Sequence, residues 1–310
     1  MSDGTGASPE VTIGIPVFNG ANFLADALES ATSQVDVDLE IVVVDNGSTD
    51  ETLAIAEKFA AVDDRIRIDP TPENRGASYS FNRCVELARG TYFRWAAHDD
   101  VFDPTFTRRC IDALEADPGV SVAVTQANMI DEHGDVVEAL EDFMGARGDD
   151  PVQRGFDIMM DSRWCLHIFG VVRTEELRST GLIGGFAGSD HITLLEFALR
   201  GRYVLLDGRE FGNREHQSRS VRAYGENRER DRDHWFDPLR NGDLSLPRWR
   251  RFIEYGHGVR RAPLSTMTKL RMFARFPRVM LDGHNRKPLM TEPLGYVYRR
   301  AAMAKASLRR

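Results

Sequence analysis

The amino-acid sequence predicts an α/β fold built on a doubly wound, mostly parallel sheet flanked by helices. Strand-like and helix-like stretches alternate from residue 11 onward, and the loops between them are short. Such alternation favours right-handed crossovers between parallel strands. Residues 39–44 are rich in β-branched side chains, as in a strand that is covered on both faces. A chain of 310 residues is long enough for one such domain with an appendage.

The elements of the first half follow from apolar spacing and from turn residues. Residues 22–32 place apolar side chains at helical spacing, and Gly90 ends a later helix. Ser48 and Glu51 have the spacing of a capping box, which predicts a helix with Ser48 as its N-cap. We expect strands at residues 11–18, 39–44, 65–68 and 92–97, and helices at residues 22–32, 48–59 and 77–88.

The second half continues the alternation. Pro104 opens a helix, Gly134 marks the turn of a tight hairpin, and a glycine-rich loop at residues 184–188 leads into a further helix. We expect a helix at residues 105–114, a short helix that starts at residue 174, and a further helix that follows the glycine-rich loop and ends at residue 199. Strands are expected at residues 120–125 and 203–206, and the hairpin at residues 130–137. The chain then divides into a disordered leader (residues 1–10), two halves of the sheet domain (residues 11–110 and 111–225) and a helical, basic C-terminal extension (residues 226–310).

Charge is distributed unevenly along the chain. Residues 1–239 carry 23 basic and 44 acidic side chains, whereas residues 240–310 carry 17 basic and 4 acidic ones. The basic segment is interleaved with apolar residues, which suits peripheral contact with an anionic membrane surface. Docking on the acidic body of the same chain and contact with a phosphorylated acceptor are equally open. Nucleic acid is not expected as a partner, because the segment has no recognisable binding motif.

Composition also bears on the compartment. No apolar run approaches the roughly 20 residues of a membrane span, and residues 1–10 are polar, unlike a signal peptide. The three cysteines are scattered and odd in number, which suits a reducing compartment better than a disulfide framework. We predict a cytoplasmic protein, and the basic segment leaves open a peripheral position at the inner face of the membrane.

Two adjacent carboxylates, Asp99 and Asp100, follow directly after the apolar stretch at residues 92–97. They are poorly placed for stability at the end of a buried strand, because like charges repel and desolvation is costly. They are well placed to hold a divalent cation or to orient a hydroxyl-rich ligand. The alternative is a turn in which one of them caps the next helix. No glycine-rich phosphate loop follows the first strand, so a bound diphosphate needs another positive group, such as a metal ion.

Four motifs occupy loops that a parallel sheet brings to one rim. They are residues 15–19 (IPVFN), 43–50 (VVDNGSTD), 73–76 (ENRG) and 98–100 (HDD), the last followed by Pro104. As a set, over about residues 10–220, they closely resemble the family 2 glycosyltransferases with the GT-A fold. The resemblance implies an inverting transfer of a sugar from a nucleotide-diphosphate donor, with UDP as the expected nucleotide. The acceptor would be a hydroxyl of a glycan or lipid, as in cell-envelope polysaccharide synthesis.

The same resemblance assigns roles by position. Residues 11–110 would bind the nucleotide-sugar, and residues 111–225 would bind the acceptor and carry the catalytic base. Asp99 and Asp100 match the DxD-type element that contacts the ribose and a Mn²⁺ or Mg²⁺ ion on the diphosphate. Ala97 stands where many members have an acid, so which aspartate binds metal stays open. Donor-binding residues would be Pro16, Asn19, Asp45, Asn74, Gly76 and Asp99.

On the acceptor side, Asp190 lies where family members carry an acidic pair that ends in the catalytic base, and Ser189 stands where Glu is frequent. As the base, Asp190 would take the proton of the acceptor hydroxyl; a helix N-cap is a compatible role. Residues 213–220 resemble the Arg-x-His segment of the family, with the serines shifted. There, Arg214 would pair with donor phosphate oxygens and His216 would complete the metal shell. The alternative for His216 is an exposed loop residue.

Two other functions are alternatives to a metal-dependent, inverting glycosyltransferase. A sugar nucleotidyltransferase usually shows a glycine-rich signature with Arg or Lys just after the first strand, and residues 16–20 (PVFNG) lack it. A non-catalytic sugar-nucleotide-binding or scaffold protein would have no need for Asp99, Asp100 and Asp190 together. The transferase is therefore the leading prediction, with the cation and its aspartates stabilising the leaving diphosphate.

Overall fold

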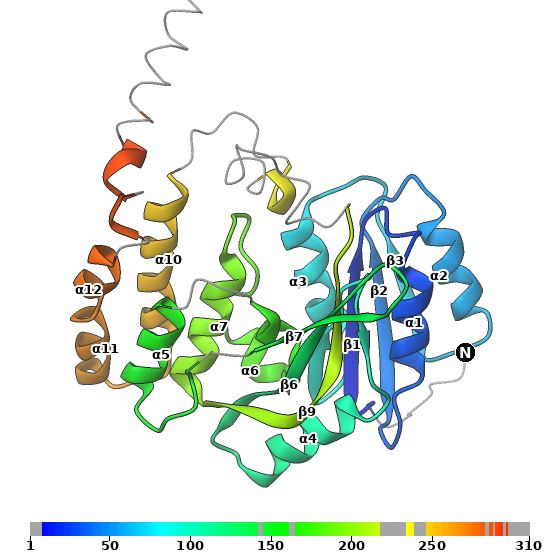
Figure 1. Ribbon diagram of the computed structural model, residues 1–310, viewed down its shortest axis with the longest axis horizontal. Helices are drawn as coiled ribbons and strands as arrows, with labels where there is room; N and C mark the ends of the chain where they lie inside the picture. Colours follow the sequence, from blue (N-terminus) through cyan, green and yellow to red (C-terminus); the bar gives the residue numbers. More distant parts are fainter. Residues whose placement is uncertain are drawn as a thin grey trace, which may run out of the picture.

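The computed structural model describes residues 8–141, 145–160, 165–217, 234–238, 246–282, 285–287, 289–293 and 296. Predictions for residues 1–7 of the leader, and for the parts of the C-terminal extension between these ranges, lie outside the described residues. Figure 1 shows a sheet flanked by helices in the N-terminal half, and the C-terminal helices gathered at the opposite end of the molecule.

The larger sheet has the strand order β3-β2-β1-β4-β8. Its first four strands are parallel and β8 is antiparallel to β4. Val17 pairs with Asp45, and Asp45 pairs with Pro70, so three strands end at one level of the sheet. This mostly parallel arrangement confirms the predicted fold class. The strands are β1 (Val11–Val17), β2 (Leu39–Asp45), β3 (Ile66–Pro70), β4 (Tyr92–Trp95) and β8 (Val172–Arg173).

Helices cover both faces of this sheet, as the side-chain alternation of β2 requires. Val42 and Val44 belong to the apolar cluster under α3, whereas Ile41 and Val43 belong to the cluster under α1. All four are fully buried, which explains the β-branched run in the sequence. The helices of this half are α1 (Leu24–Thr32), α2 (Thr52–Ala60), α3 (Ala77–Leu87) and α4 (Phe106–Ala116).

A second sheet, with the order β5-β9-β6-β7, lies beside the first. Strand β9 is much longer than predicted, because it continues past Gly208, whose φ of 104° turns the chain, and ends at Arg214. Asn213 and Arg214 therefore lie in a strand and not in a loop. The predicted hairpin turn at Gly134 is confirmed, with φ 91°. The strands are β5 (Val101–Phe102), β6 (Val120–Ile130), β7 (Val136–Leu140) and β9 (Arg202–Arg214).

The predicted capping box at Ser48 is wrong. Helix α2 begins only at Thr52, and the N–H of Thr52 donates to Asp50 Oδ1 at 3.0 Å. The hydroxyl of Ser48 instead accepts the backbone N–H of Asn19 at 2.8 Å. A contact between two loops thus takes the side chain that local spacing assigned to a helix end.

The described C-terminal helices pack on the body of the chain, as one of the open alternatives foresaw. Phe252, Val259 and Met272 share an apolar core with the helices of residues 151–200. Arg261 also donates to the fully buried carboxylate of Glu196 at 2.5 Å. In the described residues, no helix is long and apolar enough to cross a bilayer. These elements are α5 (Pro151–Met160), the 3₁₀ helix η1 (Leu166–Phe169), α6 (Thr174–Arg178), α7 (Ser189–Arg200), α10 (Pro247–Arg261), α11 (Thr266–Phe273) and α12 (Phe276–Leu281).

Candidate active site

The loops that follow β1 and β2 are joined through Asn19. Its backbone N–H donates to Ser48 Oγ at 2.8 Å, and its side-chain Oδ1 accepts the N–H of Thr49 at 2.8 Å. Asn19 adopts φ 52°, a left-handed conformation that Asn tolerates better than most residues. Pro16 lies within β1, and its partner in the sheet is Val44. The sheet thus brings the first two predicted loops into direct contact.

A second tie joins the loops after β2 and β3, and it depends on Asn46, which sequence reasoning did not select. The buried Asn46 amide donates to Asn74 Oδ1 and to the Gly76 carbonyl, both at 3.0 Å, and accepts the N–H of Arg75 at 3.0 Å. Asn74 Oδ1 also accepts the N–H of Gly76 at 2.8 Å. Asp45, just before Asn46, is buried and accepts the N–H of Ser48 at 3.3 Å. The sequence signal that could have pointed to Asn46 is its position between the end of a predicted strand and Gly47.

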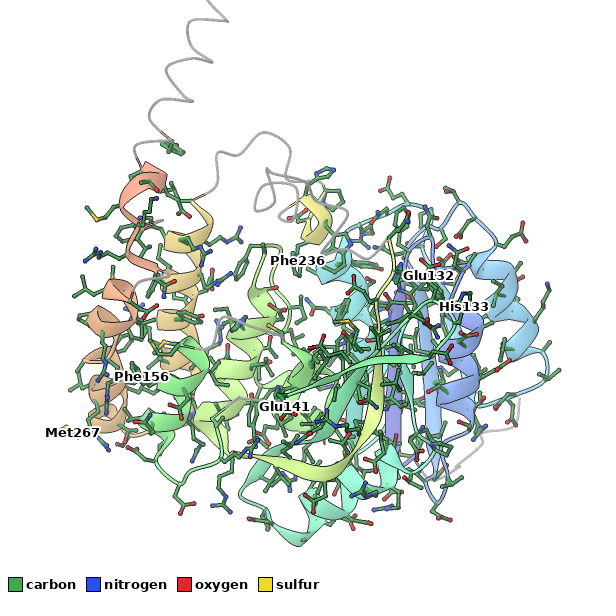
Figure 2. The ribbon with its side chains drawn as sticks, in the orientation of Figure 1. Glu132, His133, Glu141, Phe156, Phe236 and Met267 are labelled. Carbon is green, nitrogen blue, oxygen red and sulfur yellow. The ribbon has the colours of Figure 1, made fainter. Side chains whose placement is uncertain are left out.

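Residues 234–238 connect this rim to the later glycine-rich loop. Gly76 has φ 89°, and a Cβ placed on it would meet the carbonyl oxygen of Phe236 at 2.4 Å. The Ser78 hydroxyl donates to the same carbonyl at 2.7 Å. A Cβ on Gly185 would lie 3.1 Å from Asp237 Oδ2. The two loops therefore border a common segment, which Figure 2 shows at Phe236 near the end of α3.

The two acidic side chains after β4 point to different partners. Asp100 is buried, and its Oδ1 accepts the backbone N–H of Arg214 at 2.8 Å and the Asn213 amide at 3.1 Å. Asp99 is less buried, and its Oδ2 lies 2.9 Å from Nε2 of His216. Asp100 is thus tied to strand β9, while Asp99 forms a carboxylate–imidazole pair.

Arg214 is engaged by the protein in a way that the predicted phosphate contact did not anticipate. Its buried guanidinium donates through Nε to the Asp99 carbonyl at 2.8 Å and through Nη1 to the Glu132 carbonyl at 2.9 Å. Nη2 forms an ion pair with Asp26 of α1 at 2.8 Å. Figure 2 places Glu132 on the hairpin that crosses toward α1. The guanidinium therefore holds the turn of the acidic pair against α1 and the β6–β7 hairpin.

His216 is buried, so the expectation of an exposed loop residue does not describe it. Its ring packs on Phe23 with a centroid distance of 4.7 Å and faces Asp99. In the described part of the chain no cluster of three or more His, Cys, Asp or Glu side chains has metal-binding geometry. Mg²⁺ in nucleotide sites is commonly held by one or two carboxylates, with phosphates and water completing the shell. Asp99 supplies one such carboxylate, and the imidazole of His216 lies beside it.

Asp190 occupies the first turn of α7, and its Oδ1 accepts the adjacent N–H of His191 at 2.9 Å. The residue that precedes the helix is Gly188, in the left-handed region at φ 84°. The loop before it is anchored to α3, because Ile183 and Asn82 exchange hydrogen bonds of 2.9 and 3.0 Å. Gly188, and not Asp190, is therefore the N-cap residue of α7, and no side chain in the described part of the chain caps the helix. The carboxylate of Asp190 lies in the first helical turn, and its role as a base stays a prediction.

Helix α10 contributes two arginines to the surroundings of Asp190 that the sequence did not single out. A Cβ on Gly188 would lie 2.5 Å from Nη2 of Arg251, so the missing side chain makes room for this guanidinium. Arg250 stacks over the ring of Phe186 at 4.4 Å. Burial raises the pKa of the neighbouring Tyr255 hydroxyl to about 12, and the charges of Arg251 and Asp190 act on it in opposite directions. The basic C-terminal segment therefore lines the predicted acceptor side.

Solved structures define the class of this fold. The S. aureus protein TarS (residues 1–349, in complex with UDP-GlcNAc) superposes with a TM-score of 0.63 at 14% identity, over 93% of this chain and 80% of that one. The mannosyltransferase PcManGT of Pyrobaculum calidifontis, in complex with GDP-Man and Mn²⁺, gives a TM-score of 0.54 at 16% identity, over 95% and 86%. The fold is that of the GT-A glycosyltransferases.

Sequence relatives identify the family. Residues 12–164 match the model of glycosyl transferase family 2, and the chain carries a glycosyltransferase domain of this family. The chondroitin synthase of Escherichia coli is 33% identical over 129 residues, 42% of this chain and 19% of that protein. An uncharacterized glycosyltransferase of Rickettsia prowazekii is 40% identical over 107 residues, 34% of this chain and 32% of that protein. The chain thus spans a third or less of the length of these relatives.

Proposed function

We propose that this protein is a metal-dependent, inverting glycosyltransferase that moves a sugar from a nucleotide-diphosphate donor to a hydroxyl of a glycan or lipid acceptor. The observation that carries the proposal is the pair formed by Asp99 and His216, 2.9 Å apart. It lies just beyond β4, among the loops that follow the parallel strands. In open α/β sheets, ligands bind at this edge.

The donor would bind to the loops after β1, β2 and β3, which the hydrogen bonds of Asn19 and Asn46 hold together. Asp45 would hydrogen-bond the base, and the turn at Asn74 and Gly76 would approach the ribose. Pro16 and Asn19 would line the base or ribose pocket. Asp99 would contact the ribose or the metal ion. Asn46 keeps Asn74 and Gly76 in register, so it would position the pocket and leave the contacts to its neighbours. Because the rim lacks a glycine-rich phosphate loop, the diphosphate needs a cation here.

A Mn²⁺ or Mg²⁺ ion bound to the donor would neutralise the diphosphate as it leaves. Asp99 and His216 are the described side chains that would hold it. The carboxylate of Asp100 is hydrogen-bonded to strand β9, so Asp100 would keep Asp99 in place. As a metal ligand, Asp100 is a second choice after Asp99. Arg214 would act on the donor indirectly, by fixing this turn, and not by touching the phosphates.

The transfer itself would be a single displacement at the anomeric carbon. The acceptor oxygen forms a bond to this carbon as the bond from the carbon to the diphosphate oxygen breaks, and the configuration inverts. The carboxylate of Asp190 accepts the proton of the attacking hydroxyl. Arg251, which lies against Gly188 beside Asp190, would orient the acceptor or balance the local charge.

UDP is the proposed nucleotide, because the structural relative TarS is seen with UDP-GlcNAc, although PcManGT is seen with GDP-Man. Cytoplasmic cell-envelope polysaccharide synthesis is the proposed setting, with the protein peripheral at the inner face of the membrane. A panel of nucleotide-sugars tested by thermal shift with Mn²⁺ identifies the donor, since a ligand that binds only the folded state raises apparent stability.

Donor turnover tests the activity. The assay measures nucleotide release with Mn²⁺ and with chelator, for the wild type, Asp99→Asn and Asp190→Asn. The control is Asp112→Asn, on the exposed side of α4. We expect metal-dependent turnover that both site changes reduce and the control leaves intact. Turnover that is indifferent to metal contradicts the mechanism. Donor binding without turnover supports the non-catalytic scaffold, and sugar-1-phosphate with nucleoside triphosphate as the active substrates supports the nucleotidyltransferase.

A further inference from the structure

The described C-terminal helices expose an unusual set of side chains. Ten large apolar side chains are exposed in the described chain, and five of them lie on these helices. Outside the helices the exposed ones are four valines and Phe18, whereas on the helices they are isoleucine, leucine and methionine: Ile253, Met267, Leu270, Leu281 and Met290. Figure 2 shows Met267 at the outer margin of the molecule, pointing away from the body.

The apolar side chains follow one stripe along α11 and into α12. Met267, Leu270 and Ala274 are exposed at helical spacing, and Leu281 continues the exposure at the end of α12. Met272 and Val279, on the opposite side of the same two helices, are fully buried against the body. The two helices thus bury one side and leave an apolar stripe uncovered.

The exposed charged side chains of the described C-terminal helices themselves have a single sign. Among described residues 246–293, all exposed charged side chains are basic: Arg260, Arg261, Arg271, Arg278, Arg286 and Lys287. The three acidic side chains of this segment are less exposed, and Glu254 is near His257. Arg261 and Arg271 form ion pairs with the body, to Glu196 and Asp150. Arg260, Arg278, Arg286 and Lys287 are exposed in the same C-terminal segment as the apolar stripe.

We propose that this stripe, Met267–Leu281 of α11 and α12 with its flanking basic residues, lies on an anionic lipid surface. Long apolar side chains would enter the boundary between headgroups and acyl chains, and the arginines and lysine would contact anionic headgroups. A second copy of the chain is a poor partner for the same surface, because it would set like charges against each other. Residues 1–239 carry a net negative charge, so an anionic surface repels the body of the molecule. This repulsion would orient the stripe toward the surface.

Vesicle co-sedimentation of the full chain tests the proposal independently of catalysis. The vesicles are phosphatidylcholine with or without phosphatidylglycerol, at low and high salt. We expect binding only with phosphatidylglycerol, weakened by salt. The double change Met267→Glu and Leu270→Glu should lower binding by at least about tenfold, while Arg286→Gln with Lys287→Gln should lower it by roughly fivefold per charge.

Val62→Glu is the matched control, since Val62 is 85% exposed between α2 and β3, at the other end of the molecule (Figure 1). It should leave vesicle binding unchanged. All variants should release nucleotide from the donor in solution at the wild-type rate, so that a failure of the transferase proposal would appear separately. The proposal is overturned if the wild type ignores anionic vesicles, or if Val62→Glu weakens binding as much as the stripe change. It is also overturned if the stripe change abolishes a dimer in size-exclusion chromatography without altering vesicle binding.

Discussion

Arg214 donates its backbone N–H to the carboxylate of Asp100 and its side-chain Nε to the carbonyl of Asp99, both at 2.8 Å. One residue at the end of β9 therefore grips both members of the acidic pair. The carboxylate of Asp100 accepts hydrogen bonds from strand β9, whereas the carboxylate of Asp99 faces His216. The division of labour between the two aspartates follows from the strand beside them.

The first prediction separates the two aspartates. Asp99→Asn should lower donor turnover on the order of 100-fold, because it removes the carboxylate proposed to hold the cation that neutralises the leaving diphosphate. It should change stability little, since Asp99 keeps partial contact with solvent. Asp100→Asn should instead destabilise the fold by about 1.5–3 kcal/mol, because an amide replaces a charged acceptor of buried donors. Turnover at saturating donor and urea unfolding measure the two effects. Full activity in Asp99→Asn, with inactivity in a well-folded Asp100→Asn, would reverse the assignment.

The second prediction concerns Arg214. Arg214→Lys should cost about 3 kcal/mol of unfolding free energy, because an ammonium cannot reproduce the fork that reaches α1, the hairpin and the acidic turn. Arg108→Lys is the control. Arg108 is more exposed and pairs with surface carboxylates, so about 0–1 kcal/mol is expected. Chemical denaturation measures both. If Arg214→Lys keeps its stability and raises the donor KM many-fold, the guanidinium binds phosphate after all.

The third prediction compares two glycines with similar φ angles. Gly188 and Gly134 have φ of 84° and 91°, so an alanine at either should cost about 1–2 kcal/mol. A Cβ on Gly134 would meet nothing within 4 Å, whereas one on Gly188 would press on Arg251. Only Gly188→Ala should therefore lower turnover, by about tenfold or more, because it shifts the surroundings of Asp190.

The variant Arg251→Ala tests the same contact from the other side, because it removes the side chain that a Cβ on Gly188 would meet. In the double variant with Gly188→Ala the clash is gone, so the loss should be no greater than for Arg251→Ala alone. Stopped-time turnover assays and thermal melts on the four proteins provide the measurements. Equal activity of Gly188→Ala and Gly134→Ala would show that Arg251 has no part in the site.

The fourth prediction concerns pH and the buried Glu40. Burial raises the pKa of this carboxyl, but hydrogen bonds from Thr12, Arg89 and Arg67 outweigh it and hold the pKa below the ordinary value of 4.5. A carboxyl with a lowered pKa in the folded state stabilises the protein above about pH 4.5, and this stabilisation is lost as pH falls through the lower folded value. The unfolding free energy should therefore decline with acid in that window.

Glu40→Gln should lower stability at neutral pH by about 1.5–3 kcal/mol and should flatten the acid decline. Glu57→Gln, on the exposed side of α2, should do neither. Urea unfolding across pH 3–7 (on the order of four points) follows both effects. An acid decline of unchanged steepness in Glu40→Gln would assign the pH dependence to other carboxyls.

Much of the site was readable from the sequence because it depends on strand order and on where strands end. The run at residues 39–44 required two covered faces, and Val42 and Ile41 do pack on opposite clusters. Parallel strands then bring the loops at Asn19, Asn74 and Asp99 to one edge, whatever their separation along the chain.

Where the prediction failed, a distant partner had taken a side chain that local spacing had assigned elsewhere. Ser48 had the spacing of a helix cap, but the N–H of Asn19 occupies its hydroxyl. The predicted contact of Arg214 with phosphate stays untested, but its intramolecular partners were not foreseen: β9 extends past Gly208, and the guanidinium bonds to the carbonyl of Asp99. A local sequence pattern does not predict such a distant partner.

The sequence by itself determined the alternation of strands and helices, the edge of the sheet where the polar loops gather, and the division into an acidic body and a basic C-terminal segment. These follow from periodicity, turn chemistry and charge, which are local properties. Only the tertiary structure decided that Asp99 meets His216 while Asp100 meets β9, and that α10 reaches Gly188. Those choices depend on contacts between residues more than 60 positions apart along the chain. Such contacts are set by packing, and the sequence records them only indirectly.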